Sequence, residues 1–307
     1  MISHPVLLWK LLILKKAAIY HLHDPELLPL GLFLNLFSSK VIYDVHEWVE
    51  KDIPNKKVPF RKIFISLYNW FEALTSKKLY FILAENSYEQ FYKNRIVNYS
   101  VIRNYPDYKA FQQYEATNRH SKSLFYIGNL TGNRGMKQMI NLLTCLKYRN
   151  EDFQLICIGR LGKPLDKYLT GIPNYQKVSN QIHFIDYLPV NVAMQFSVDC
   201  LAGLALYDDL PNHRDSLSTK MFEYMAVGLP VITSNFPLYE DIVVKNSCGF
   251  CIDPDHTELL ADAVLELYNN QQLANSMAMN GIKAVRNLYN WESEKQKLFN
   301  IYKNLLA

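Results

Sequence analysis

The sequence has few cysteines and no low-complexity tract, and each shortage excludes a class of protein. Its five cysteines are an odd number spread along 307 residues, which argues against a disulfide framework and for a reducing compartment. Cys248 and Cys251 form a CxxC, but no second CxxC and no nearby pair of histidines accompanies them. We therefore interpret them as two small apolar strand residues and not as zinc ligands.

Long hydrophobic runs are also absent. The most hydrophobic N-terminal run, residues 6–14, is nine residues long and contains Lys10. A membrane span needs about 20 apolar residues, so we expect no transmembrane helix there. The run also lacks the basic start and the small-residue exit of a cleavable signal peptide.

The net charge is small and unevenly divided. Residues 1–115 hold 15 Lys and Arg against 11 Asp and Glu, whereas residues 116–307 hold 18 of each kind, so the whole excess of +4 lies in the first part. A basic bias of this size fits a surface that faces anionic lipid. Scattered solvated charge explains it equally well.

What is present is the pattern of an α/β protein, in which strand-like runs alternate with helix-like segments. The strand-like runs cover residues 18–24, 40–47, 79–85, 99–106, 123–129, 153–160, 181–189, 201–207, 229–235 and 249–253. A polar, aperiodic stretch at 107–122 interrupts the alternation and is typical of a linker. We predict two Rossmann-like domains, residues 1–115 and 116–290, with ligand in a cleft at the carboxyl ends of the strands. A helix at 291–307 is expected to pack back on the first domain.

The helix that opens LSTKMFEYMAVGLPVITS, residues 217–234, raises a question about charge. Lys220 and Glu223 lie three residues apart and project from one face. As a surface ion pair they would contribute only about 0.2 to 0.5 kcal/mol. A lysine in the first turn also faces the positive end of the helix dipole, where an anion is favoured. Ser218 or Thr219 can cap this helix, which adds backbone N–H groups to an anion site.

A second candidate anion site follows the strand-like run at 123–129. The turn LTGNRGMK leads into a helix from Gly135 and offers backbone N–H groups together with Arg134. It matches neither GxxxxGK[ST] nor GxGxxG, and alone it is an ordinary strand-to-helix turn. Two anion sites at one sheet edge suggest a diphosphate ligand.

The order of these segments, and LSTKMFEYMAVGLPVI above all, resembles the retaining glycosyltransferases of family 4, a GT-B group that uses nucleotide-sugar donors. YIGNLTGNRG, FQLICIGR and IDYLP support the resemblance, as do YHLHDPELLPLG and VIYDVHE nearer the start. It runs from about residue 17 to the C-terminus. It implies that Glu223 binds the ribose hydroxyls and that Arg134 and Lys220 hold the diphosphate. The donor-binding residues it assigns are Gly128, Asn129, Arg134, Gly159, Arg160, Tyr187, Leu188, Leu217, Ser218, Thr219, Lys220 and Glu223.

The same resemblance assigns catalytic roles to His23, Arg134, Lys220 and Asp215. His23 matches the family histidine that lies against the transferred sugar, and the resemblance alone favours it over His21 and His46. Two positions depart from the family pattern. Asp215 stands where the family has a Glu, so its shorter side chain puts its reach to the donor sugar in doubt. Asn129 stands where the family often has a basic residue, which leaves one diphosphate contact weaker or supplied by Arg134.

The reaction implied is sugar transfer with retention, in which cations and helix N–H groups stabilise the charge that builds on the leaving diphosphate. No metal or other cofactor is required. A DxD occurs at Asp253 and Asp255, but we interpret Asp255 as a helix N-cap with Glu258 at the capping-box position. The expected partners are a UDP- or GDP-sugar and a glycan or lipid-linked acceptor, with no nucleic acid.

The first domain is shorter than in this fold as a rule, because only 16 residues, which read as a helix, precede Ala17. We therefore expect a truncated or divergent enzyme of polysaccharide biosynthesis. It is expected in the cytoplasm, with peripheral contact to the inner face of the membrane through the first domain. Two alternatives stay open. One is a non-catalytic subunit that binds a partner glycosyltransferase, and the other is a different GT-B enzyme, such as a sugar-nucleotide epimerase or a glycogen-synthase-like polymerase.

Overall fold

The computed structural model describes residues 17–46, 61–116, 120–160 and 165–307. The chain divides into two compact units. Unit 1 comprises Met1–Asn104 and Glu292–Ala307, and unit 2 comprises Tyr105–Trp291. The hydrophobic run at 6–14 and the helix expected before Ala17 lie outside the described residues.

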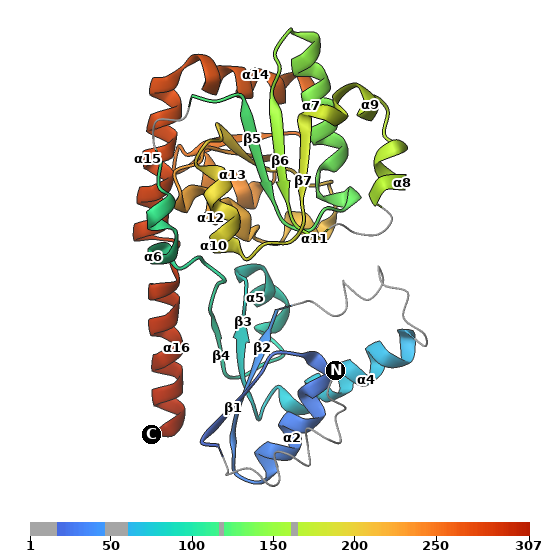
Figure 1. Ribbon diagram of the computed structural model, residues 1–307. Helices are drawn as coiled ribbons and strands as arrows, with labels where there is room; N and C mark the ends of the chain where they lie inside the picture. The colour runs from blue at the N-terminus through green and yellow to red at the C-terminus, as the bar shows by residue number, and fades with distance from the viewer. Residues whose placement is uncertain (1–16, 47–60, 117–119, 161–164) are drawn as a thin grey trace. The chain divides into compact units, whose positions relative to one another are not determined.

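Unit 1 contains a four-stranded parallel sheet in the order β1-β2-β3-β4 (Figure 1). The strands are β1 (Ile19–Leu22), β2 (Lys40–Val45), β3 (Tyr80–Leu83) and β4 (Tyr99–Val101). β2 is buried along all but its first residue, as expected for a strand whose two faces are both covered. β1 lies at one edge of the sheet within the part of the chain that the structure describes.

Helices cover this sheet. They are the 3₁₀ turn η1 (Pro25–Leu27), α2 (Leu28–Leu36), α4 (Arg61–Thr75), α5 (Asn86–Tyr92) and α16 (Trp291–Leu306), the last of which returns from the end of the chain. Leu28, Tyr43 and Phe81 belong to the buried core that the strands and helices share. Arg103 ties α16 to this unit, because its backbone N–H and its guanidinium both contact the buried carboxylate of Glu294.

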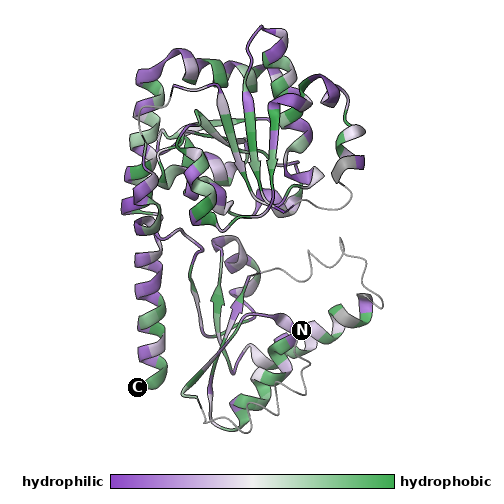
Figure 2. Cartoon of the chain, in the orientation of Figure 1, coloured by the Kyte–Doolittle hydropathy of each residue, from purple (hydrophilic) through white to green (hydrophobic). Residues whose placement is uncertain are grey.

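Unit 2 contains a six-stranded parallel sheet in the order β10-β9-β8-β5-β6-β7. Its strands are β5 (Ser123–Ile127), β6 (Gln154–Ile158), β7 (Ile182–Ile185), β8 (Ala202–Ala205), β9 (Val231–Ser234) and β10 (Gly249–Ile252). Hydrophobic colour runs along several of these strands (Figure 2). Every observed strand lies inside a run predicted from the sequence, and the predicted α/β class is confirmed.

The longer helices of unit 2 are α7 (Met136–Tyr148), α12 (Thr219–Ala226), α14 (Thr257–Asn269) and α15 (Gln271–Asn287). Shorter segments are α6 (Tyr108–Phe111), η3 (Gln112–Tyr114), η4 (Gly132–Arg134), α8 (Leu165–Thr170), α9 (Tyr175–Val178), η5 (Ser179–Gln181), α10 (Val190–Ala193), η6 (Met194–Ser197), α11 (Pro211–Arg214) and α13 (Pro237–Val243). α12 packs directly on β8, because a side chain at Gly203 would collide with the Tyr224 ring. No helix among the described residues is both long enough and apolar enough to cross a membrane.

Three local predictions were wrong. The stretch at 107–122 is not purely a linker, because α6 and η3 form within it. Asp255 is not an N-cap, since α14 begins at Thr257 with His256 at the N-cap position and no side-chain cap. Ser218 does occupy the N-cap position of α12, but its hydroxyl bonds the Tyr207 hydroxyl at 2.8 Å and caps no backbone N–H.

Candidate active site

The carboxyl edge of the sheet in unit 2 brings Gly128 and Lys220 together. Gly128 directly follows β5 and adopts a φ of 135°, a conformation that favours glycine. A Cβ there would lie 3.3 Å from the Lys220 Nζ, within contact of the ammonium. The glycine therefore leaves open the space next to the lysine, at the place where a ligand of this fold class binds.

Lys220 is buried, with only 4% of the residue exposed, so it is not a surface charge. Its Nζ lies 3.9 Å from the ring centre of Tyr126 and 5.0 Å from that of Tyr207. No described residue accepts a hydrogen bond from this Nζ. Burial, with the charge of Arg134 adding to it, lowers the pKa of Lys220 to about 7. Two aromatic faces thus stabilise the cation without using its three N–H donors.

Glu223 lies one turn along α12 and is half-buried. Burial raises the pKa of its carboxyl to about 7, and the nearby charge of Lys220 opposes that rise. Lys220 and Glu223 form no ion pair in the structure, so the interpretation of these two residues as a surface ion pair is wrong. The ammonium of Lys220 and the carboxylate of Glu223 are close enough to influence each other's pKa, but each can still bind a ligand.

Arg134 ends the 3₁₀ turn η4 just before α7, and its charge acts on Lys220, Tyr126 and Tyr207. The structure therefore brings the two predicted cations into one electrostatic environment. Asn129 is exposed, and its backbone carbonyl accepts a hydrogen bond of 2.9 Å from the Tyr126 hydroxyl. That bond fixes the turn that carries the glycine.

The ends of β6 and β7 place four more predicted residues beside this turn. A Cβ at Gly159 would lie 1.8 Å from the Gly128 carbonyl oxygen, so the two turns pack backbone against backbone. The exposed Arg160 lies over the Tyr187 ring at 5.0 Å. Leu188 packs against the core of the unit. This exposed cation–π pair offers a guanidinium and an aromatic ring, both of which can contact a nucleobase.

The remaining predicted residues of unit 2 lie at or before the start of α12. Leu217 packs on the core, Ser218 is buried, and Thr219 is exposed. Asp215 is the C-cap residue of α11, and its backbone N–H donates to the Pro211 carbonyl. Its carboxylate is half-buried and adds to the negative charge around Arg214.

His23 belongs to a separate cluster in unit 1, around the buried carboxylate of Asp44. The Oδ2 atom of Asp44 lies 3.4 Å from His21 Nε2, 3.4 Å from His23 Nδ1 and 3.1 Å from His46 Nε2. His21 stacks on His23, and a hydrogen-bond distance of 2.7 Å joins His21 Nδ1 to the Tyr302 hydroxyl. All three histidines therefore share one carboxylate oxygen.

The cluster shifts the pKa values of its members. Burial alone would raise the pKa of Asp44, but the hydrogen bonds of His21 and His46 outweigh it and hold the pKa at about 2. Burial and the charge of His21 lower the pKa of His23. His23 is the most exposed of the three imidazoles, so it is the one that a ligand reaches most easily. The other carboxylate oxygen, Asp44 Oδ1, is buried and has no hydrogen-bond partner among the described residues.

Two imidazoles and one carboxylate of this cluster could also hold a metal ion. The ligand atoms of His21, His23 and Asp44 all lie within 4.8 Å of one another. Mixed nitrogen and oxygen donors of this kind suit a transition metal better than Mg²⁺. The reaction described below assigns no step to a metal.

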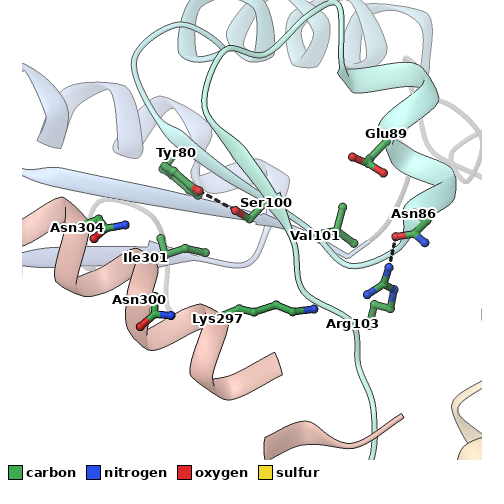
Figure 3. A pocket seen from close by; sticks show the side chains of 10 residues that line it. All are labelled: Tyr80, Asn86, Glu89, Ser100, Val101, Arg103, Lys297, Asn300, Ile301 and Asn304. Carbon is green, nitrogen blue, oxygen red and sulfur yellow. Dashed lines mark hydrogen bonds between the residues drawn. The ribbon is translucent and has the colours of Figure 1, made fainter. Parts of the chain in front are cut away.

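A pocket elsewhere in unit 1 contains none of the predicted residues. It lies where β3, β4 and α5 meet α16, and its lining includes Tyr80, Arg103 and Lys297 (Figure 3). Both cations have partners close by, since Arg103 bonds Asn86 and Lys297 bonds Glu294 at 2.7 Å. The pocket is therefore a weaker candidate than the Lys220 site.

The two tyrosine rings beside Lys220 and the carboxylate beside the three histidines were not predicted from the sequence. Tyr126 and Tyr207 occupy strand-like runs, where aromatic residues usually belong to the core. Asp44 follows three apolar residues in a buried strand, and a buried carboxylate there was the signal that a polar partner must lie nearby. Tyr302 comes from the far end of the chain, and no local pattern connects it with His21.

The family model described as glycosyl transferases group 1 matches residues 107–284, which is more than half of the chain. This chain belongs to that family. The predicted family is therefore confirmed, and the matched region contains every site residue described above in unit 2.

Two curated proteins are similar to this chain at low sequence identity. The capsular polysaccharide biosynthesis glycosyltransferase CapM of Staphylococcus aureus is 25% identical over 190 residues, which are 58% of this chain and 45% of that protein. A GDP-mannose-dependent alpha-(1-6)-phosphatidylinositol monomannoside mannosyltransferase of Mycobacterium tuberculosis is 25% identical over 179 residues, or 56% of this chain and 45% of that protein. The match thus spans about half the length of each relative.

Solved structures show the fold of this group 1 glycosyltransferase over nearly its whole length. A glycosyltransferase from Rickettsia africae ESF-5 has a TM-score of 0.75 and 17% identity, and the match covers 100% of this chain and 83% of that one. Anabaena Alr3699/HepE in complex with UDP has a TM-score of 0.75 and 13% identity, over 98% and 82% of the two chains. The predicted GT-B fold with two parallel α/β sheets is confirmed.

Proposed function

We propose that this chain transfers a sugar from a nucleotide-diphosphate sugar to a glycan or lipid-linked acceptor, with retention, in cell-surface polysaccharide biosynthesis. One observation carries the proposal. Lys220 is buried at the carboxyl edge of the larger sheet, beside a glycine and within the field of Arg134, and its ammonium has no acceptor among the described residues. A buried cation without a partner is costly unless an anion binds it.

The diphosphate of a sugar nucleotide supplies such an anion. As the bond from the anomeric carbon to the diphosphate breaks, negative charge builds on the leaving oxygen, and Lys220 and Arg134 stabilise it more than they stabilise the ground state. We assign Glu223 to the ribose hydroxyls, because a carboxylate accepts two hydrogen bonds. Arg160 and Tyr187 are assigned to the base, and His23 to the transferred sugar. Asp215 is assigned to the sugar as well.

The relatives suggest the substrates. The mannosyltransferase named above is GDP-mannose-dependent and acts on a phosphatidylinositol monomannoside, and the Anabaena structure contains UDP. We therefore propose a UDP- or GDP-sugar as donor. CapM is named for capsular polysaccharide biosynthesis, which agrees with a glycan or lipid-linked acceptor at the inner face of the cytoplasmic membrane.

A panel of UDP- and GDP-sugars, each offered with and without lipid-linked acceptors, tests the proposal. Release of nucleoside diphosphate together with an α-linked product is the expected result for one donor of the panel. Lys220→Met should lower the rate of that release about 10² to 10³-fold, whereas Lys245→Met should leave it unchanged. Lys245 is exposed and pairs with Asp241 of α13. If no donor binds the wild-type protein, the proposed function is wrong.

The second candidate function is that of a subunit that binds a partner glycosyltransferase without transferring sugar itself. Among the residues that the structure describes, β1 lies at one edge of the sheet, and an edge strand can pair its N–H and C=O groups with another chain. A donor that binds but is never consumed, together with a stable complex with a second glycosyltransferase, would favour this function over the first.

A further inference from the structure

Two neighbouring strands of unit 1 bring four side chains with metal-binding atoms to one edge of the sheet. β1 and β2 are parallel and adjacent, with His21 opposite Ile42 (Figure 1). His23 directly follows β1, Asp44 lies one residue before the end of β2, and His46 directly follows β2. Because the carboxyl ends of parallel strands meet at the same edge of a sheet, the three imidazoles gather around one carboxylate.

The spacing of the donor atoms fits a tetrahedral metal ion. Asp44 Oδ2 lies 3.4 Å from both His21 Nε2 and His23 Nδ1, which is long for a hydrogen bond. Bonds of about 2.0 to 2.1 Å to a tetrahedral Zn²⁺ ion separate two ligand atoms by about 3.3 to 3.4 Å. His46 Nε2 lies 3.1 Å from the same oxygen and 3.2 Å from His23 Nδ1, which makes it the candidate for a fourth ligand.

Contacts outside this set of donor atoms prepare two of its members. The Tyr302 hydroxyl of α16 lies 2.7 Å from His21 Nδ1. When Nδ1 carries the proton and donates it to this hydroxyl, Nε2 presents the lone pair that a metal ion needs, and metal-binding histidines usually have such an outer partner. Asp44 Oδ1 is buried and has no hydrogen-bond partner among the described residues. This second oxygen can therefore bind the ion as well or accept a hydrogen bond from a water on it.

We propose that His21, His23 and Asp44 bind a divalent transition metal ion of the Zn²⁺ type, with His46 or water as the fourth ligand. Nitrogen and oxygen donors in this combination suit such an ion. Binding needs neither the donor nor the site in unit 2, so it does not depend on the proposed sugar transfer. One consequence does rest on that function. His23 is assigned to the transferred sugar, so an ion on its Nδ1 competes with the sugar, and Zn²⁺ should inhibit transfer.

Titrations of the metal-stripped full chain, with Co²⁺ followed by visible absorption and with Zn²⁺ followed by calorimetry, test this site. We expect one ion per chain and the intense absorption of four-coordinate Co²⁺. His23→Gln should weaken Zn²⁺ binding at least about 100-fold, because a ligand is lost, and Tyr302→Phe about tenfold, because only an outer hydrogen bond is lost. The matched control is His256→Gln, which should bind as the wild type does. His256 is also exposed, and its Nδ1 lies 3.8 Å from the carboxylate of Asp253.

The folded state of each variant is checked by melting curves in metal-free buffer. Added Zn²⁺ should raise the melting temperature of the wild type and of His256→Gln, because the ion binds the folded chain, and should leave that of His23→Gln unchanged. His23 is exposed and Tyr302→Phe keeps its ring, so both test variants should fold.

Four results would overturn the metal site. They are a wild type that binds neither ion, a His23→Gln variant that binds as tightly as the wild type, equal losses in His23→Gln and His256→Gln, and the charge-transfer absorption of a Co²⁺–thiolate bond. The last result would place the ion on a cysteine such as Cys251, which is unpaired and partly exposed. A chain that binds Zn²⁺ but transfers sugar from no donor would leave this site standing and reject the proposed function.

Discussion

The two units bury charge in opposite ways. In unit 2, Lys220 is buried against two tyrosine rings with no acceptor for its N–H groups among the described residues, and its pKa falls to about 7. In unit 1, Asp44 is buried beneath three histidines, and its pKa falls to about 2 because those partners favour the charged form. A buried charge with partners stabilises the fold, whereas a buried charge without partners indicates a binding site for a ligand of opposite charge.

The largest effect is expected from removal of the unpartnered charge of Lys220. Lys220→Ala should lower the rate of nucleoside diphosphate release about 10² to 10³-fold, because one group that stabilises the leaving diphosphate is lost. Its stability should change little or rise, since a buried uncompensated ammonium is removed. Release rates per folded molecule and urea melts measure the two quantities. A sharp fall in melting temperature with an unchanged rate would make Lys220 a structural residue.

Glu223→Ala should weaken UDP or GDP binding by about 10-fold to 100-fold, because hydrogen bonds to a charged group contribute about 1.5 to 3 kcal/mol. The apolar side of α12 stays intact, so the fold should survive. Titration calorimetry with the free nucleotides gives the affinity, and Glu240→Ala, on another helix of the same unit, serves as the control. Unchanged nucleotide affinity in a folded Glu223 variant would remove the ribose assignment.

Part of the fold and of the two charged sites could be predicted from the sequence, and part could not. The alternation of apolar runs located every strand, because parallel strands buried on two faces are apolar along their length. The unusual position of Lys220 in the first turn of its helix pointed to an anion. The tyrosine rings under it could not be predicted, since they come from β5 and from the loop after β8, and only the sheet order brings them together. For the same reason the choice among three histidines rested on resemblance, while Asp44 and Tyr302 escaped notice.

Asp44→Asn removes the buried charge that has partners, and we expect it to lower the stability of the protein. The folded pKa of about 2 lies below the ordinary value of 3.8, so the carboxylate adds stability above about pH 4 and loses it as the pH falls toward 2. The variant should be about 2 kcal/mol less stable at neutral pH, with the difference closing below pH 4. Donor binding in unit 2 should not change, whereas sugar transfer should fall if His23 is displaced. Asp241→Asn, an exposed carboxylate, should show no such acid-dependent difference.

The unpartnered lysine should change stability with the same sign as Asp44 but in a higher pH window, because its lowered pKa reflects a penalty on the charged form instead of a gain from partners. Its folded pKa of about 7 lies below the ordinary value of 10.5, so between these values the unfolded chain binds the proton that the folded chain has lost. The stability of the wild type relative to Lys220→Met should therefore rise with pH from 7 to 10, by up to about 1.4 kcal/mol per pH unit. Urea melts of both proteins across this range measure the slope. A parallel pair of curves would mean that Lys220 keeps its proton with the help of a partner.

The smallest expected effect tests how far the partnered cluster extends. Tyr302 of α16 lies with its hydroxyl 2.7 Å from His21 Nδ1, and His21 stacks on His23. Tyr302→Phe removes that single hydrogen bond and keeps the ring, so we expect a loss of about 1 kcal/mol of stability and a change in the ring chemical shifts of His21 by NMR. Tyr148→Phe, whose hydroxyl meets only an exposed lysine, should change neither. If the ring chemical shifts of His21 are the same in the variant and the wild type, α16 covers the sheet of unit 1 without orienting its histidines, and the cluster consists of Asp44 and its three imidazoles alone.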